Sequence, residues 1–235
     1  MNKLAVLAVS ILVFCGAMLW YLAATDLNGF IRSQAITQVS LITKQQVDVK
    51  QVTSALEQGD ISLHQLTIKD INSSADALLI EQVAAKVDAA TINQAAIIVN
   101  SVNFSNLRAN IKFTADGDSN FKQLAQQIES QFAYIDSYTP EKFSAKKKTS
   151  SNKKPVTTMQ VRNIKASNIV LSIDLQDVNG KQLSIEIPEL SLAAIGNKEA
   201  IDAGFIGTNV TQALVNAIVS LAEIHYANAM ENSSN

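Results

Sequence analysis

The chain begins with one long apolar stretch, after which its pattern changes to helices and alternating strands. From Leu4 to Ala24 the sequence LAVLAVSILVFCGAMLWYLAA holds 21 residues and no charged side chain. A helix of this length spans roughly 30 Å at about 1.5 Å per residue, which matches the hydrocarbon core of a bilayer. The pattern therefore predicts an uncleaved transmembrane anchor over residues 1–25, whose membrane-spanning residues include Leu4, Leu12, Phe14, Leu19 and Trp20.

Three other interpretations of this stretch are weaker. A cleaved signal peptide needs small residues at its cleavage site, whereas the best candidate, Leu22-Ala23-Ala24, begins with a bulky residue. A lipoprotein signal needs a small residue before the modified cysteine, and Phe14 precedes Cys15. A buried helix of a soluble core is the third alternative. Lys3, on the N-terminal side of the stretch, favours an N-terminus in the cytoplasm.

Apolar positions after the anchor predict a helix and then several strands. Steps of three and four from Leu27 to Val39 place one apolar stripe on a helix over Asp26 to Ile42, with Asp26 as a candidate N-cap. In the strands that follow, the apolar phase changes after His64-Gln65, which predicts a β-bulge. The predicted strands lie at Val47–Val49, Ile61–Ile68, Val83–Ala89 and Leu107–Phe113, with a short apolar run at Ile97–Val99.

A turn and a second helix close this first group of strands. Asp116-Gly117-Asp118 has the composition of a turn, and Ser119 can cap the helix that follows. One face of this helix carries Phe121, Leu124, Ala125, Ile128 and Phe132. From Ser137 to Val156 no apolar period survives, and the prolines and lysines of this stretch predict a solvated linker or long loop.

Strand alternation returns after the linker. The strands at Ile169–Leu175 and Leu183–Ile187 are joined by a predicted hairpin turn at Val178-Asn179-Gly180, and Pro188 indicates an edge strand or a strand end. Asn209 is placed to cap a final apolar helix. The predicted units are the anchor (1–25), a helix with a first β unit and its helix (26–136), the Lys/Ser-rich linker (137–156), a second β unit with the C-terminal helix (157–228) and a polar tail (229–235).

Two segments of the chain resemble each other. When Val99–Phe113 is set against Val161–Leu175, Val99 coincides with Val161, Ser105-Asn106 with Ser167-Asn168, and Ile111 with Ile173. The remaining apolar positions fall in register as well. The match indicates one β unit that is used twice.

Together these elements predict an α+β fold, in which the anchor precedes an antiparallel, twisted, groove-like sheet packed with amphipathic helices. The apolar face of the sheet has two interpretations. Helices can cover it as a core, or part of it can stay open as a groove in which acyl chains bind by displacing water. The candidate residues of this face are Leu107, Ala109, Ile111, Phe113, Ile169, Leu171, Ile173 and Leu175.

Composition and motifs indicate which kinds of binding and catalysis the chain does not favour. The 19 Lys and Arg residues against 21 Asp and Glu residues give no basic field for nucleic acid. The one cysteine, Cys15, lies in the anchor, and the two histidines, His64 and His225, are far apart in the sequence without metal-ligand spacing. Neither a nucleophile elbow nor a phosphate-binding loop occurs. We therefore expect a protein that is not an enzyme and uses no metal or other cofactor.

The chain resembles the AsmA family of bacterial envelope proteins, in a short form. The resemblance lies in the anchor running into DLNGFIRSQAITQVS, in the strand pair GDISLHQLTIKDI, in GDSNFKQL after a strand, and in LSIEIPELSLAAIG before the last helix. It implies a single-pass protein of the inner membrane with its C-terminal body in the periplasm, connected with outer-membrane biogenesis and phospholipid transport. Residues 26–235 are too few for the long grooves of the large family members, which leaves an accessory or partner role.

The expected function is that of a membrane-anchored, non-enzymatic periplasmic protein that binds lipid or assists envelope lipid homeostasis. The expected partners are the inner membrane, a phospholipid ligand and an envelope protein, with no nucleic acid. The alternative is a structural or scaffolding protein whose sheet edges or helices dock onto another envelope protein.

Overall fold

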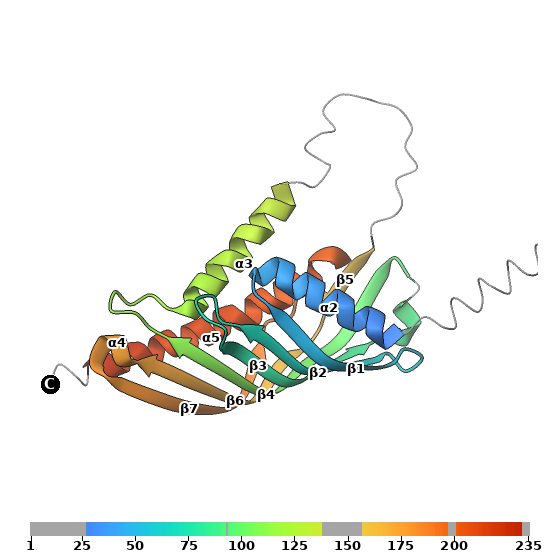
Figure 1. Cartoon of the computed structure of the whole chain (residues 1–235). Coiled ribbons are helices and arrows are strands. Elements are labelled where there is room, and N and C mark those ends of the chain that lie inside the picture. The colour runs from blue at the N-terminus through green and yellow to red at the C-terminus, as the bar shows by residue number, and fades with distance from the viewer. Residues whose placement is uncertain (1–26, 93, 138–156, 197–200, 232–235) are drawn as a thin grey trace, which may run out of the picture.

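The described part of the protein is an α+β fold, as the sequence predicts, and it is built on one sheet. The computed structural model describes residues 27–92, 94–137, 157–196 and 201–231, which hold eight strands and four α-helices (Figure 1). The strands are β1 (Val47–Ala55), β2 (Asp60–Lys69), β3 (Asp76–Val87), β4 (Ala96–Lys112), β5 (Thr158–Val161), β6 (Ile164–Leu175), β7 (Lys181–Leu192) and β8 (Ile201–Asp202). The helices are α2 (Leu27–Thr43), α3 (Asn120–Ser137), α4 (Gln176–Asn179) and α5 (Ile206–Glu231), with short 3-10 turns η1 (Ala89–Thr91) and η3 (Ala203–Phe205).

The sheet is mixed, which corrects the antiparallel sheet expected from the sequence. Strands β1 to β4 form an antiparallel meander, and β6 and β7 form an antiparallel hairpin. Strand β4, however, runs parallel to both β5 and β6, and β5 pairs antiparallel with β8. A parallel pair needs a long crossover connection. Here the connection includes α3 and residues 138–156. Residues 138–156 make up most of the predicted linker and lie outside the described residues.

The two similar segments of the sequence lie side by side in this parallel junction. Leu107 pairs with Ile169 and Ile111 with Ile173, so the positions that coincide in the repeat are neighbours in space. Val99 likewise pairs with Val161, at the end of β5. The two β units therefore form one continuous sheet in which their equivalent strands are adjacent.

Six strands change the phase of their apolar side chains along one line across the sheet. We call this line the step row. In β4 the buried side chains on either side of it are Phe104 and Leu107. They are three residues apart, whereas side chains on the same face of a regular strand are two residues apart. In β6 the same step separates Ala166 from Ile169. The step row consists of Lys50, Gln65, Glu81, Asn106, Asn168 and Pro188, one residue from each of β1, β2, β3, β4, β6 and β7.

The backbone of the step row explains how the strands stay paired. Gln65, Asn106 and Asn168 have positive φ angles of 52°, 54° and 52°, which turns the following side chain to the opposite face. Because the six strands step at the same row, the pairs before and after it keep one register. The predicted β-bulge after His64-Gln65 is thus corrected. The apolar phase does change at this point. However, the neighbouring strands change phase at the same row, so β2 contains no extra residue of the kind that defines a bulge.

Helices α2, α3 and α5 lie on one side of the sheet, and the other side carries no helix among the described elements (Figure 1). The helix-covered side forms the core. Helix α3 contributes Phe121, Leu124 and Ile128, which are buried on the face that the sequence predicts. The side chain of Phe132 lies outside those described. At its N-terminus, Ser119 Oγ accepts a hydrogen bond from Lys122 N at 3.2 Å, which confirms the predicted cap.

Some element boundaries differ from the sequence predictions. Strand β4 runs without interruption for 17 residues, so the predicted pieces Ile97–Val99 and Leu107–Phe113 belong to one strand that continues to Lys112. The last helix begins at Ile206 and not after Asn209. Asn209 Nδ2 donates to Phe205 O inside the helical run, whereas Asp202 caps the preceding turn by accepting from Gly204 N at 2.8 Å. The helix also continues to Glu231, into the predicted polar tail.

The predicted anchor over residues 1–25 lies outside the described residues. Within the described part of the chain, one helical segment, Ala203–Glu231, is long and apolar enough to cross a membrane by length and composition. Its side chains Leu214, Val215 and Ile218 are buried in the core. In this structure the segment therefore packs against the sheet domain along one of its faces.

Candidate functional site

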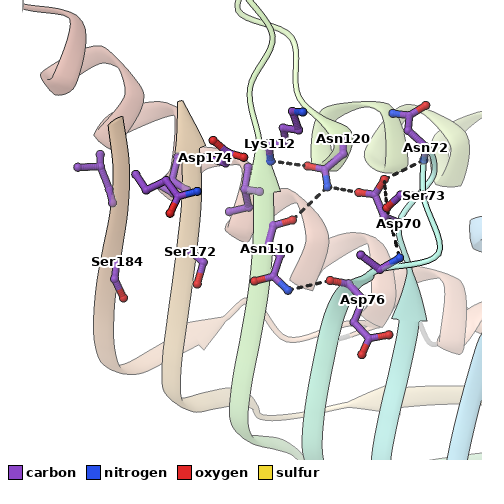
Figure 2. A pocket seen from close by; sticks show the side chains of 15 residues that line it. Asp70, Asn72, Ser73, Asp76, Asn110, Lys112, Asn120, Ser172, Asp174 and Ser184 are labelled. Atoms are coloured by element: carbon purple, nitrogen blue, oxygen red, sulfur yellow. Dashed lines mark hydrogen bonds between the residues drawn. The ribbon is translucent and has the colours of Figure 1, made fainter. Parts of the chain in front are cut away.

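A pocket lined by polar and aliphatic residues opens at one end of the sheet, where several elements finish. It has a volume of about 670 Å³ and is bounded by the β2–β3 loop, the end of β4, the start of α3, the end of β6 and the start of β7 (Figure 2). The lining residues are Asp70, Asn72, Ser73, Ala75, Asp76, Asn110, Ile111, Lys112, Asn120, Ser172, Ile173, Asp174, Gln182, Leu183 and Ser184.

Three strands supply a polar row to this pocket. Asn110 of β4 pairs with Ser172 of β6, which pairs in turn with Ser184 of β7. Their side chains point to the same side of the sheet (Figure 2). This row follows from strand alternation, because the intervening residues Ile111 and Ile173 are buried on the helix-covered side.

The side-chain amide of Asn120 links the elements that form one wall of the pocket. Asn120 Oδ1 accepts from Lys112 N at 3.0 Å, and Nδ2 donates to Asn110 O at 3.0 Å, so the side chain pairs with β4 much as a neighbouring strand would. The same Nδ2 also donates to Asp70 Oδ2 (Figure 2). Asn120 is buried, and its hydrogen-bonding groups are satisfied by these contacts. Asn120 therefore has a structural role, because it connects the start of α3 to β4 and to the β2–β3 loop.

The charged side chains around the pocket also form hydrogen bonds or ion pairs within the protein. Asp76 accepts from Lys69 Nζ at 2.7 Å, and Asp174 accepts from Gln176 N at 2.9 Å. Lys112 lies 3.6 Å from Asp177, on the short helix α4. Asp70 Oδ1 accepts from Asn72 N at 2.8 Å, which shapes the β2–β3 loop. The pocket offers hydrogen bonds to a small polar molecule but no poised nucleophile or base.

The two histidines, which could bind a metal or act in catalysis, lie on different elements. His64 is on β2 and His225 on α5. Among the described residues, no group of three or more His, Cys, Asp or Glu side chains is arranged to hold a metal ion. The hydrogen bond from Thr114 Oγ1 lowers the pKa of Asp116 below its usual value, but this carboxylate is exposed in the turn before α3. Gly117, with φ 80°, confirms that Asp116-Gly117-Asp118 forms a turn.

The predicted apolar sheet face is found in the core. Its eight candidate residues are each exposed by 1% or less, beneath the layer of helices (Figure 1). They are Leu107, Ala109, Ile111, Phe113, Ile169, Leu171, Ile173 and Leu175. Phe113 also stacks on Tyr226 of α5, with ring centroids 4.5 Å apart, so aromatic packing joins the end of β4 to the last helix.

The apolar face continues onto β7, where it is only half covered. Five aliphatic side chains of β7 face the helix-covered side and are partly buried, in contrast to the fully buried row of β6 beside them. We call them the β7 row: Leu183, Ile185, Ile187, Leu190 and Leu192. Among the described strands β7 pairs only with β6, so the β7 row lies along an edge of the sheet. Pro188, predicted to mark an edge, lies in this strand.

Sequence reasoning identified the β7 strand but not its partial cover, because alternation alone does not show where a helix stops covering a sheet. It also missed the role of Asn120, whose signal is an asparagine at the start of a helix after a strand and a tight turn. Comparison of the chain with protein-family models and with curated proteins gives no match.

Proposed function

We propose that this chain is a membrane-tethered, non-enzymatic protein of the bacterial envelope that binds a lipid acyl chain along the β7 row. In this proposal residues 1–25 anchor it in the inner membrane, and the sheet domain lies in the periplasm as a short AsmA-like protein. The observation that carries the proposal is the partly exposed β7 row, which continues the buried apolar face to an edge of the sheet.

The β7 row suits an extended acyl chain in length and chemistry. From Leu183 to Leu192 a strand covers roughly 30 Å at about 3.3 Å per residue. The acyl chains of one leaflet fill about half of a hydrocarbon core of similar thickness, so the row is long enough for one chain. Partly exposed aliphatic side chains gain about 25 cal/mol for each Å² of apolar surface that a ligand removes from water. Such binding needs no reactive group.

A photoreactive lipid tests the proposal. The full chain is reconstituted in vesicles that contain a phospholipid with a diazirine in its acyl chain, and crosslinked peptides are mapped by mass spectrometry. We expect adducts on Lys181–Leu192 in addition to those on the anchor. Replacing Ile185 with Gln should reduce the β7 adducts severalfold, because a polar side chain interrupts the apolar row.

Val170 provides the matched control. It is an aliphatic residue on β6 that is partly buried like Ile185 but alternates to the side of the sheet without helices. Val170→Gln should leave the β7 adducts unchanged, and circular dichroism should show that both variants are folded. Adducts confined to residues 4–24 would rule out the β7 row as a lipid site.

The same edge supports a second candidate function, docking of another envelope protein. An edge strand presents unpaired backbone groups that a strand of a partner can bind. Pro188 and the Lys165–Glu189 ion pair, at 2.9 Å, stand at this edge and limit such pairing to part of β7. Crosslinking in intact cells from position 186, an exposed position of β7, separates the two functions. A scaffold should trap one dominant protein, whereas a lipid-binding edge should not.

A further inference from the structure

Exposed apolar side chains gather at the end of the molecule where the described chain begins. Leu27 and Phe30, in the first turn of α2, are 42% and 57% exposed, and Leu56, in the β1–β2 turn, is 37% exposed. Ser54 Oγ donates to Asn28 Oδ1 at 2.7 Å, which holds the start of α2 beside the end of β1 (Figure 1). We call Leu27, Phe30 and Leu56 the apolar end.

The apolar end is tied closely to the proposed anchor. Only Thr25 and Asp26 separate Leu27 from Ala24, the last residue of the uncharged stretch. Three peptide steps reach at most about 11 Å even when fully extended. The interfacial layer of a bilayer is roughly 5–8 Å thick on each side of the hydrocarbon core. With residues 4–24 in the membrane, the apolar end is held within a few Å of the interface.

We infer that the apolar end inserts into the interface of the bilayer that holds the anchor and so fixes the orientation of the sheet domain on the membrane. This inference rests on the proposed anchoring. The first turn of α2 gives apolar contacts, whereas its next exposed positions, Ser33 and Gln34, are polar. Between Phe30 and Leu41 the exposed side chains of α2 are all polar. The apolar surface at the start of the helix is therefore about one turn deep, as expected for a contact of interfacial depth.

The contact is apolar and not electrostatic. The β1–β2 turn carries Glu57, and Asp60, at the start of β2, pairs with Lys86 at 2.8 Å. This arrangement provides no excess of positive charge for anionic headgroups. Insertion should therefore occur on a bilayer of phosphatidylcholine alone.

Helix α2 contains its own control. Leu41 is 48% exposed, comparable to the residues of the apolar end, but it lies in the last turn of the helix. At about 1.5 Å per residue, Leu41 is roughly 21 Å along the helix from Leu27. Insertion by the first turn predicts that α2 leads away from the bilayer, so a probe at position 41 reports an exposed apolar site of the same helix at a greater distance from the interface.

The test places a fluorophore at single cysteines in the full chain, with Cys15 replaced by Ser. Phe30→Cys, Leu56→Cys and Leu41→Cys are labelled and reconstituted in phosphatidylcholine vesicles. Quenching by aqueous iodide and by lipids with a spin label near the headgroup is then measured. We expect iodide quenching to be about threefold weaker at positions 30 and 56 than at 41, and lipid quenching to be stronger, because interfacial groups lie about 5–10 Å deep.

The outcomes separate this inference from the proposed function. Retention of the labelled protein in vesicles after an alkaline wash reports the anchor, independently of the probe. If the protein is retained but position 56 is as accessible to iodide as position 41, the inference is wrong and the anchor stands. If the wash removes the protein, both fail. A protection that appears only after anionic lipid is added would overturn the apolar contact.

Discussion

Asn168 Nδ2 donates a hydrogen bond of 3.0 Å to Oδ1 of Asn106 across the parallel junction of β6 and β4. Asn106 Nδ2 donates in turn to Glu81 Oε2 of β3 at 2.7 Å. The two asparagines are equivalent residues of the repeat, and both have positive φ angles. A chain of side-chain hydrogen bonds therefore runs along the step row, over the backbone positions where the strands change phase.

Replacing Asn106 with Ala should lower the free energy of unfolding by about 2–3 kcal/mol. Two hydrogen bonds of roughly 1 kcal/mol each are lost, and alanine tolerates positive φ less well than asparagine, which adds up to about 1 kcal/mol. Asn106→Gly should cost about half as much, since glycine adopts positive φ freely. Urea unfolding of the full chain in nanodiscs measures both values. Asn103→Ala, on the same strand but outside the step row, is the control. Equal losses for the Ala and Gly variants would show that positive φ carries no cost here.

Gly59 and Gly180 allow a comparison of two glycines with nearly the same backbone. Their φ angles are 75° and 74°, but a β-carbon on Gly59 would lie 1.9 Å from Val87 O, whereas nothing lies within 4 Å of one on Gly180. Gly180→Ala should cost about 1 kcal/mol, the ordinary cost of positive φ. Gly59→Ala should cost about 1–3 kcal/mol more, because the β2–β3 pairing must shift. Thermal melting checks the order, and similar melting temperatures for the two variants would contradict it.

Among the polar residues that line the pocket, Asn120 should be the one whose replacement with Ala destabilises the end of the sheet most. The replacement leaves Lys112 N and Asn110 O without their partner, and the loss of each of these part-buried hydrogen bonds costs about 1 kcal/mol. A double-mutant cycle with Asp70→Ala should give a non-additive loss, since the two side chains are hydrogen-bonded. Asn72→Ala, with an exposed side chain in the same pocket, is the control. Additive losses would show that Asp70 and Asn120 act independently.

The turn before α3 should respond to acid. The hydrogen bond from Thr114 lowers the folded-state pKa of Asp116 below its usual value, so the carboxylate favours the folded turn. This contribution is fully present above the unfolded-state pKa and is lost as the pH falls through the lower, folded-state pKa. Thr114→Val should raise the pKa of Asp116 toward its usual value, as measured by NMR titration of the side-chain carboxyl. An unchanged pKa would assign the shift to the backbone of the turn.

Local patterns were sufficient to predict much of the fold. Alternation at Leu107–Phe113 and at Ile169–Leu175 predicted strands with the correct buried side, and Ser119 marked the start of α3. These features depend on neighbouring residues in the sequence, where strand and helix periods act directly. The repeat also predicted a β unit that is used twice, and the structure places its two copies in one sheet.

Features that depend on distant parts of the chain could not be predicted in this way. The parallel pairing of β4 with β6 depends on a crossover whose path no local pattern gives. The half cover of Ile185 and its neighbours depends on where α5 crosses the sheet, and the role of Asn120 depends on the β2–β3 loop fifty residues earlier in the chain. In both cases the apolar or polar residues were visible in the sequence, but their surroundings were not.

The step row also governs which alignments of the strands are possible. In an ordinary sheet a strand can slide by two residues and still present the same face to the core. Here a slide of two residues would bring a position such as Asn106 opposite a residue that does not step, and the apolar side chains between the two steps would point to opposite faces. Each strand therefore has a single alignment that suits its neighbours. Misaligned pairings are disfavoured during folding without any help from the turns.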